Sequence, residues 1–171
     1  YIAMELVEGR NLRGVMNDAA ARVDEDPTRL GSGDLGTAGA GYFEQVARIT
    51  REVAEALAFS HEHGVVHRDV KPHNVLVADD GRVCVVDFGL AKDLEGEALS
   101  LTGEFAGTPH YVSPEQAAGS GVDGRTDVFS LGVVLYELLT LAMPFDGHTT
   151  RQVLDAVQGR EPRGVRGRSP H

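Results

Sequence analysis

The chain has 171 residues, of which 42% are hydrophobic and 6% aromatic, enough for the core of one domain but few for two. Its 26 acidic and 16 basic residues give a net charge of −10, which disfavours binding to the phosphate backbone of a nucleic acid. No run of about 18 apolar residues occurs, so we predict no membrane-spanning segment in this chain.

The N-terminal quarter of the chain predicts a strand, a helix and a loop. Residues 1–7 form an apolar run that ends at a Glu-Gly pair, a pattern typical of a buried strand followed by a turn. A short helix is expected from Leu12 to about Ala21. Residues 22–41 are rich in Gly, Asp, Ser and Thr, so we predict an exposed, mobile loop there.

The middle of the chain predicts a long helix and a hairpin. Apolar residues recur at helical spacing from Tyr42 to about His63, and Gly64 then ends the helix. The face that we expect to be buried consists of Phe43, Val46, Ala47, Thr50, Val53, Ala54 and Leu57. Two β-branched runs, 75–77 and 83–86, flank an Asp-Asp-Gly sequence that favours a hairpin turn.

The C-terminal part predicts a second long helix, from about Arg125 to Leu141, which is apolar enough to lie in the core. Its predicted core face consists of Val128, Leu131, Leu135, Leu138 and Leu139. A shorter helix is expected over residues 153–157. Residues 159–171 hold four arginines, three glycines and two prolines, which favours a disordered tail after a domain that spans residues 1–158.

Neither the start of the chain nor its cysteine content indicates secretion. Residues 1–5 lack the basic region and the apolar core of a signal peptide. Cys84 is the single cysteine, so an internal disulfide is excluded, and its apolar strand predicts a small buried hydrophobe. We predict a cytoplasmic location for this part, although a longer parent protein could be anchored to a membrane.

Three short motifs carry the functional information. The sequence from His67 to Asn74 is His-Arg-Asp-Val-Lys-Pro-His-Asn, and an Asp-Phe-Gly motif begins at Asp87, eighteen residues after Asp69. These two motifs resemble the catalytic loop and the metal-binding motif of protein kinases. Residues 107–115, Gly-Thr-Pro-His-Tyr-Val-Ser-Pro-Glu, are similar to the end of a kinase activation segment.

The resemblance covers about residues 1–162 and is greatest to the bacterial Ser/Thr kinases of eukaryotic (Hanks) type. It implies an α+β, protein-kinase-like fold, a mostly helical C-terminal lobe with a short catalytic β-hairpin. The glycine-rich loop, the strand lysine and the helix glutamate of the family are not found in the chain. We therefore expect a truncated domain, without its N-terminal lobe and inactive alone.

The resemblance implies catalytic roles for Asp69, Lys71 and Asn74. Asp69 would accept or orient the substrate hydroxyl, and Lys71 would neutralise the γ-phosphate of ATP. Asn74 and Asp87 would supply oxygen ligands to Mg²⁺ or Mn²⁺. Since Asn74 starts one predicted strand and Asp87 ends the next, a single hairpin can bring both to one metal.

The resemblance also implies where adenine lies. The backbone of Glu5 and Val7 would bind the adenine ring, Met4 would be the gatekeeper, and Leu76 would form the floor of the pocket.

Structural roles follow in the same way. His67 would pack beneath Phe88, which belongs with Gly89 to the metal-binding motif. Glu115 ends the third motif, and Asp127 would bond the backbone of the catalytic loop. By contrast, His61 and His63 lie near the end of a predicted helix, where the helix dipole is enough to account for them.

Regulation is implied by a cation and several hydroxyls. Arg68 is available to pair with a phosphate on the activation segment, for which Ser100 and Thr102 are the candidates. Thr108 would contact Asp69 and Lys71 and help to select Ser or Thr substrates.

The resemblance therefore implies a kinase that transfers the γ-phosphoryl of ATP to Ser or Thr hydroxyls of protein substrates. Two alternatives stay open. A small-molecule phosphotransferase of the aminoglycoside kinase type shares the spacing of the acidic residues, but Lys71-Pro72 and residues 107–115 argue against it. A non-catalytic pseudokinase scaffold should have lost Asp69, Asn74 or Asp87, and all three are present.

Overall fold

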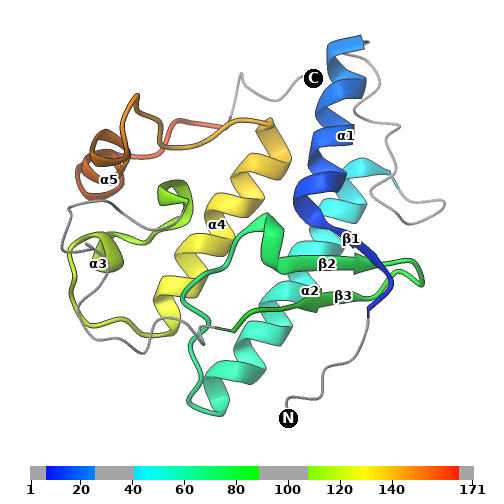
Figure 1. The fold of residues 1–171 in the computed structure, drawn as a ribbon, viewed down its shortest axis with the longest axis horizontal. Coiled ribbons are helices and arrows are strands. Elements are labelled where there is room, and N and C mark those ends of the chain that lie inside the picture. Colours follow the sequence, from blue (N-terminus) through cyan, green and yellow to red (C-terminus); the bar gives the residue numbers. More distant parts are fainter. Residues whose placement is uncertain (1–6, 26–40, 89–107, 166–171) are drawn as a thin grey trace.

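The computed structural model of the chain describes residues 7–25, 41–88 and 108–165. They form a helix-rich α+β fold with one small antiparallel sheet, which confirms the predicted class (Figure 1). The helices are α1 (Leu12–Glu25), α2 (Tyr42–Glu62), α3 (Pro114–Ala117), α4 (Gly124–Thr140) and α5 (Thr150–Gly159). The strands are β1 (Gly9–Asn11), β2 (Val75–Ala78) and β3 (Val83–Val85), and two 3₁₀ turns are η2 (Pro72–Asn74) and η3 (Pro109–Tyr111).

The sheet contains the predicted hairpin and one strand that was not predicted. β2 and β3 pair antiparallel with Leu76 opposite Cys84, and β1 pairs with the other edge of β2. The prediction of a turn at Gly9 was therefore wrong. A Cβ on Gly9 would lie 2.4 Å from the carbonyl oxygen of Val77, so the missing side chain is what lets β1 approach β2. Residues 1–6 of the predicted first strand lie outside the described residues.

Helix α1 starts at Leu12, as predicted, but continues to Glu25, so the first residues of the predicted loop are helical. The helix continues because the sequence has neither Gly nor Pro between Val15 and Pro27. It ends before Pro27 because the residue that precedes a proline is disfavoured in a helix. The rest of the predicted loop, residues 26–40, lies outside the described residues.

Helix α2 has the predicted extent, but its buried face is rotated from the predicted one. The buried residues are Tyr42, Gln45, Val46, Ile49, Val53, Leu57 and Ser60. Phe43 is 42% exposed, and Ala47 and Ala54 are exposed as well. The face that carries Tyr42 packs against α4, where the Tyr42 hydroxyl donates to the carbonyl oxygen of Leu138 at 2.7 Å, and the neighbouring row of apolar residues faces outward.

Helix α4 also has the predicted extent, and Leu141 ends it in a left-handed conformation. Its core face differs from the prediction, because Val133 and Val134 are buried in the same core cluster as the apolar residues of α2. Leu138 is fully buried, whereas Val128 is 65% exposed. The other three predicted core residues, Leu131, Leu135 and Leu139, are half-buried.

The C-terminal region contains the predicted short helix. Helix α5 is longer than the predicted 153–157 segment, begins at the cap residue Thr149, and packs Val153 and Val157 into a small second core with Phe145. Beyond it, the Arg163 guanidinium pairs with Asp146 at 2.7 Å. Residues 166–171 lie outside the described residues.

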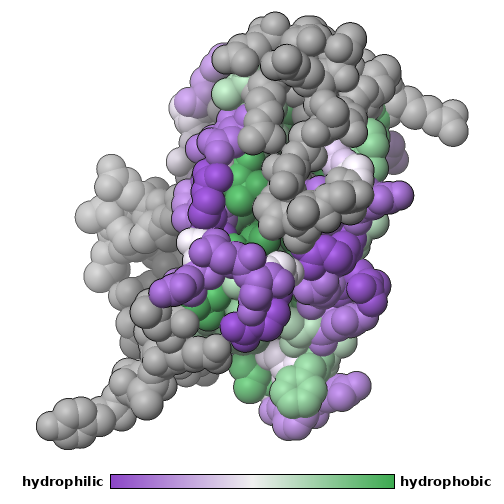
Figure 2. Space-filling model, turned by 90° about the vertical axis from the view of Figure 1, so that its right-hand side faces the viewer, coloured by the Kyte–Doolittle hydropathy of each residue, from purple (hydrophilic) through white to green (hydrophobic). Residues whose placement is uncertain are grey.

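Hydrophilic side chains cover much of the described surface on the side shown in Figure 2, and apolar residues are visible between them. Among the described residues, no helix is long and apolar enough to cross a membrane.

Candidate active site

The loop that follows α2 brings three of the predicted catalytic residues together. The Lys71 ammonium lies 2.7 Å from Asp69 Oδ2, and Asn74 Nδ2 donates to the same oxygen at 3.1 Å and to the Asp69 carbonyl at 2.9 Å. Both Asp69 and Lys71 keep part of their side chains exposed, at 35% and 21%. The carboxylate is therefore held by two donors and still accessible to a substrate.

The hairpin links this loop to the predicted metal ligands. Asn74 is the last residue of η2, and β2 begins directly after it. The Val86 amide donates to the Asn74 carbonyl at 2.9 Å, so Asp87, the next residue, leaves the hairpin at the same end. Asp87 is exposed and has a left-handed φ of 59°, which is uncommon outside glycine and is found often at functional sites.

The donor set fits a hard divalent cation. Both partners of Asn74 Nδ2 are oxygen acceptors, so the amide nitrogen must face them and Oδ1 is left to bind a cation. Asp87 adds a carboxylate, and amide and carboxylate oxygens are the ligands of Mg²⁺. Among the described residues, no group of three or more His, Cys, Asp or Glu side chains could hold a metal, so these two residues would need oxygens from a substrate or water.

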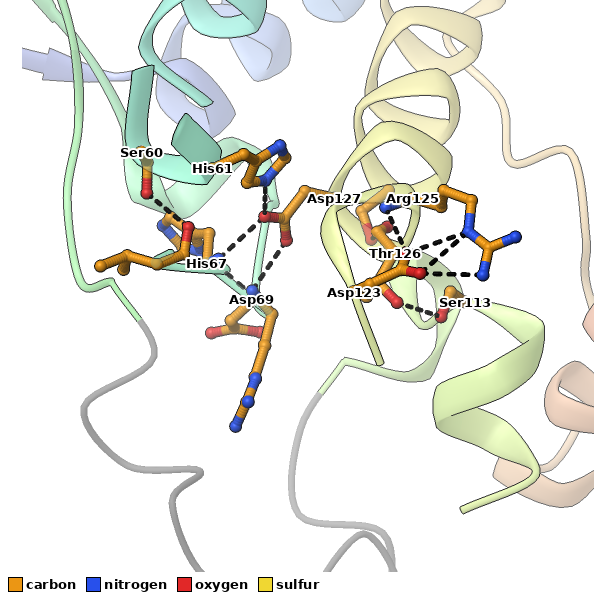
Figure 3. Close-up of polar contacts among 12 residues, drawn as sticks. Ser60, His61, His67, Asp69, Ser113, Asp123, Arg125, Thr126 and Asp127 are labelled. Carbon is orange, nitrogen blue, oxygen red and sulfur yellow. Dashed lines mark hydrogen bonds and ion pairs between the residues drawn. The ribbon is translucent and has the colours of Figure 1, made fainter. Parts of the chain in front are cut away.

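Asp127 bonds the backbone of the loop, the contact that the resemblance implies. Its side chain is fully buried at the start of α4 and accepts the backbone N–H of His67 and that of Arg68, each at 2.8 Å (Figure 3). Arg68 has a left-handed φ of 65°, a strained conformation for a residue with a side chain. The two bonds to Asp127 compensate for that strain and set the direction of the loop.

His67 joins both motifs. It is fully buried, its ring centroid lies 4.6 Å from that of Phe88, and its Nδ1 accepts the Asp69 backbone N–H at 3.2 Å. Because Nδ1 is the acceptor, Nε2 carries the proton and donates to the Val86 carbonyl at 2.9 Å. His67 thus connects the loop residue Asp69 with the segment that leads to Asp87.

The segment from Thr108 to Ala117 is fastened to α4 and to the loop. Ser113 is fully buried and caps α3, and its hydroxyl lies 3.3 Å from that of Thr126. The Gln116 amide donates to the Arg68 carbonyl at 2.8 Å. Thr108 itself is exposed, and Ser100 and Thr102 lie outside the described residues, as does Gly89.

Glu115 lies in the first turn of α3 and accepts the Thr126 hydroxyl at 2.6 Å. Partial burial opposes ionisation, but this bond, backbone and Ser113 hydrogen bonds, and the charge of Arg125 together hold the pKa of Glu115 below its usual value. The carboxylate is thus ionised at neutral pH and ties α3 to the start of α4.

The predicted adenine residues are described only in part. Val7 is half-buried just before β1, and Leu76 is half-buried in the central strand, opposite both Asn11 and Cys84. Cys84 is half-buried, so the expectation of a buried side chain was wrong. Met4 and Glu5 lie outside the described residues.

Two polar clusters of the site were missed by the sequence analysis. His61 Nε2 lies 2.7 Å from Asp127 Oδ2, so His61 contacts the loop anchor in addition to ending a helix. The second cluster joins Arg13, Tyr111 and Glu137 from three separate elements. These residues lie too far apart in the sequence for a local spacing to connect them. The one signal of a buried polar cluster was Glu137, a glutamate inside an apolar helix.

Comparison with known proteins identifies the family of the chain. Residues 1–162 match the protein kinase domain family, and the chain belongs to that family. The match has the extent that the motifs predicted. It also confirms that the α+β fold is that of a protein kinase.

Curated relatives are bacterial proteins named as serine/threonine-protein kinases. The chain is 41% identical over 147 residues to a probable one from Clostridium perfringens, which covers 86% of this chain and 19% of that protein. It is 40% identical over 149 residues to PknB of Mycolicibacterium smegmatis, covering 86% and 21%, and 40% identical over 164 residues to PksC of Streptomyces coelicolor, covering 95% and 27%. The chain thus spans about a fifth to a quarter of the length of these relatives.

Proposed function

We propose that the gene product containing this chain transfers the γ-phosphoryl group of ATP to Ser or Thr hydroxyls of proteins. The observation that carries the proposal is the contact of Lys71 and Asn74 with the Asp69 carboxylate, at the end of the hairpin that leads to Asp87. The names of the relatives support Ser and Thr as acceptors.

In the proposed reaction the substrate hydroxyl oxygen forms a bond to the γ-phosphorus, and the bond from that phosphorus to the β-phosphate oxygen breaks, releasing ADP. Asp69 orients the hydroxyl and takes its proton, since its carboxylate is partly exposed. Lys71 Nζ, 2.7 Å from Asp69, supplies positive charge beside the transferred group. The contact between the two residues is relevant because positioning provides much of the rate in this chemistry.

Mg²⁺ or Mn²⁺ would be held by Asn74 Oδ1 and the Asp87 carboxylate, and when bound it neutralises negative charge on the phosphates. The chain's own contribution is to hold these two oxygens at one end of the hairpin, through the Val86 to Asn74 backbone bond. For adenine we retain the backbone of Glu5 and Val7, Met4 as gatekeeper and Leu76 as the floor.

Regulation and location are part of the same proposal. Phosphate on Ser100 or Thr102 would pair with Arg68, and Thr108 would face the acceptor residue of the substrate. The partners are protein substrates, and the net charge of −10 argues against nucleic acid. We place the catalytic domain in the cytoplasm, within a parent protein that could be membrane-anchored.

The test is phosphate transfer from radiolabelled ATP to a mixed protein substrate by the gene product that contains this chain. Asp87→Ala removes a metal ligand and should lower the rate by at least about a hundredfold. Asp79→Ala is the matched control, because Asp79 is an exposed carboxylate in the turn of the same hairpin. A near-normal rate for Asp87→Ala, or transfer to aminoglycosides but to no protein, would contradict the proposal.

A further inference from the structure

Three charged or polar side chains from distant elements meet in the interior. Arg13 on α1 forms a bidentate ion pair with Glu137 on α4, with Nη1 to Oε1 at 2.7 Å and Nη2 to Oε2 at 3.0 Å. Tyr111 in η3 donates its hydroxyl to Glu137 Oε2 at 2.5 Å, and Arg13 Nη2 donates to the same hydroxyl. The Glu137 side chain is 8% exposed and Tyr111 is 4% exposed.

This arrangement holds Tyr111 at two points. Its hydroxyl is bound by Glu137 and Arg13, and its carbonyl oxygen accepts the Ser130 hydroxyl at 2.7 Å. Tyr111 is the last residue of η3, which follows Thr108 and leads into Ser113 and α3. Fixing the position of Tyr111 therefore also fixes the short stretch between Thr108 and Ser113, the residue that caps α3.

The cation of the cluster comes from α1, an element far from Tyr111 and Glu137 in the sequence. α1 begins directly after β1, whose Asn11 lies opposite Leu76 in the central strand. Without Arg13, the Glu137 carboxylate would be buried with Tyr111 but no positive charge, an arrangement that costs more than a paired charge. Water or a rotated side chain would then have to satisfy the carboxylate, and Tyr111 would lose its fixed partner.

We propose that Arg13 is a positioning residue for the protein substrate: by neutralising Glu137 and bonding the Tyr111 hydroxyl, it holds η3 so that Thr108 and its neighbours present the acceptor residue to Asp69. The inference rests on the proposed function. It predicts an effect on the binding of protein substrate and not of ATP, because the bonds from Lys71 and Asn74 to Asp69 involve none of the three cluster residues.

The test uses the gene product that contains this chain, with ATP and myelin basic protein as substrates. For Arg13→Leu we expect the KM for the protein to rise about fivefold or more, with the KM for ATP within about twofold. Arg13→Lys should lie between wild type and Arg13→Leu, because an ammonium lacks the fork that binds both carboxylate oxygens. Arg10→Leu is the matched control, since Arg10 pairs with Asp18 at 2.9 Å on the exposed side of the same region, and should change neither KM.

A double variant separates positioning from loss of folding. Arg13→Leu with Glu137→Gln removes both charges and keeps an acceptor for the Tyr111 hydroxyl, so the KM for the protein should return to within about threefold of wild type. A merely structural role predicts instead that both KM values and the thermal midpoint change together. An unchanged KM in Arg13→Leu, a parallel change of both KM values, or a double variant no better than the single one would overturn the inference.

A measurement independent of catalysis distinguishes this inference from the proposed function. Amide hydrogen exchange in residues 108–113 should be faster in Arg13→Leu than in wild type or Arg10→Leu. If exchange is unchanged there, the inference fails even in an active kinase. If exchange accelerates but the wild-type protein phosphorylates no protein, the positioning of η3 by Arg13 holds and the proposed function is what fails.

Discussion

His61 Nε2 lies 2.7 Å from Asp127 Oδ2, the same carboxylate oxygen that accepts the backbone N–H of His67. The last turn of α2 and the loop that carries Asp69 therefore share one anchor at the start of α4. The Asp127 carboxylate is fully buried and is surrounded by donors, as a buried charge requires. This contact makes the end of α2 part of the support of the site (Figure 3).

Replacing His61 with Ala should weaken that anchor. One oxygen of a buried carboxylate then loses its side-chain partner, which costs about 1–3 kcal/mol in the free energy of unfolding. Urea denaturation of the chain measures this cost. His63→Ala is the control, because His63 is exposed and bonds the Phe59 carbonyl at the same helix end; its cost should stay below about 0.5 kcal/mol. Equal losses in the two variants would show that the Asp127 contact contributes nothing.

Two glycines of α4 should respond in opposite directions to substitution by Ala. A Cβ on Gly124 would lie 2.7 Å from His61 Nδ1, and that ring is held by Asp127, so Gly124→Ala should destabilise the protein. Gly132 is exposed in the middle of the helix with open space around its Cβ position, so Gly132→Ala should stabilise it by about 1 kcal/mol. Thermal denaturation distinguishes the signs. A stabilising Gly124→Ala would mean that the ring moves without cost.

Tyr42 predicts a loss of stability at high pH. Burial, reinforced by the charge of Glu137, raises the pKa of Tyr42 to about 12 from its ordinary value of 10.0. Below pH 10 the hydroxyl is protonated in both the folded and the unfolded chain, so stability is unaffected. Between pH 10 and 12 the unfolded chain alone releases the proton, and the free energy of unfolding falls by on the order of 2 kcal/mol.

Tyr42→Phe tests this pH dependence by urea denaturation at pH 8 and pH 11.5. The variant should lose about 1 kcal/mol at pH 8, where the bond to Leu138 is missing, but should fall less steeply between the two values than wild type. Burial also raises the pKa of Tyr111, so part of the alkaline loss should persist in the variant. Identical slopes for the two proteins would refute the assignment to Tyr42.

Activation should depend on phosphate at Ser100 or Thr102, for which Arg68 is the proposed partner. Mass spectrometry of the active gene product should find phosphate on one of these residues. A variant carrying Ser100→Ala and Thr102→Ala should have at least about tenfold lower activity, since the phosphate that would pair with Arg68 can no longer be added. Ser120→Ala, at an exposed hydroxyl beyond α3, is the control. Full activity in the double variant would reject the proposal.

The sequence by itself determined the features that depend on neighbours along the chain. Periodicity and end residues placed α2 and α4 to within one or two residues, and two β-branched runs around a Gly turn predicted the β2–β3 hairpin. The motifs predicted that Asp69, Asn74 and Asp87 belong to one site. These features were predictable because helix ends, turns and motif spacings are encoded within a few residues.

Tertiary structure decided what depends on distant partners. Tyr42 and Phe43 are adjacent and both aromatic, yet Tyr42 is buried with its hydroxyl bonded to Leu138 on α4, whereas Phe43 is 42% exposed. β1 exists because β2 offers a free edge that Gly9 can approach, and Arg13 finds Glu137 across 124 positions of sequence. Side chains on neighbouring faces of a helix are nearly equivalent in a local pattern, so packing and buried polar pairs choose between them only when the whole chain has folded.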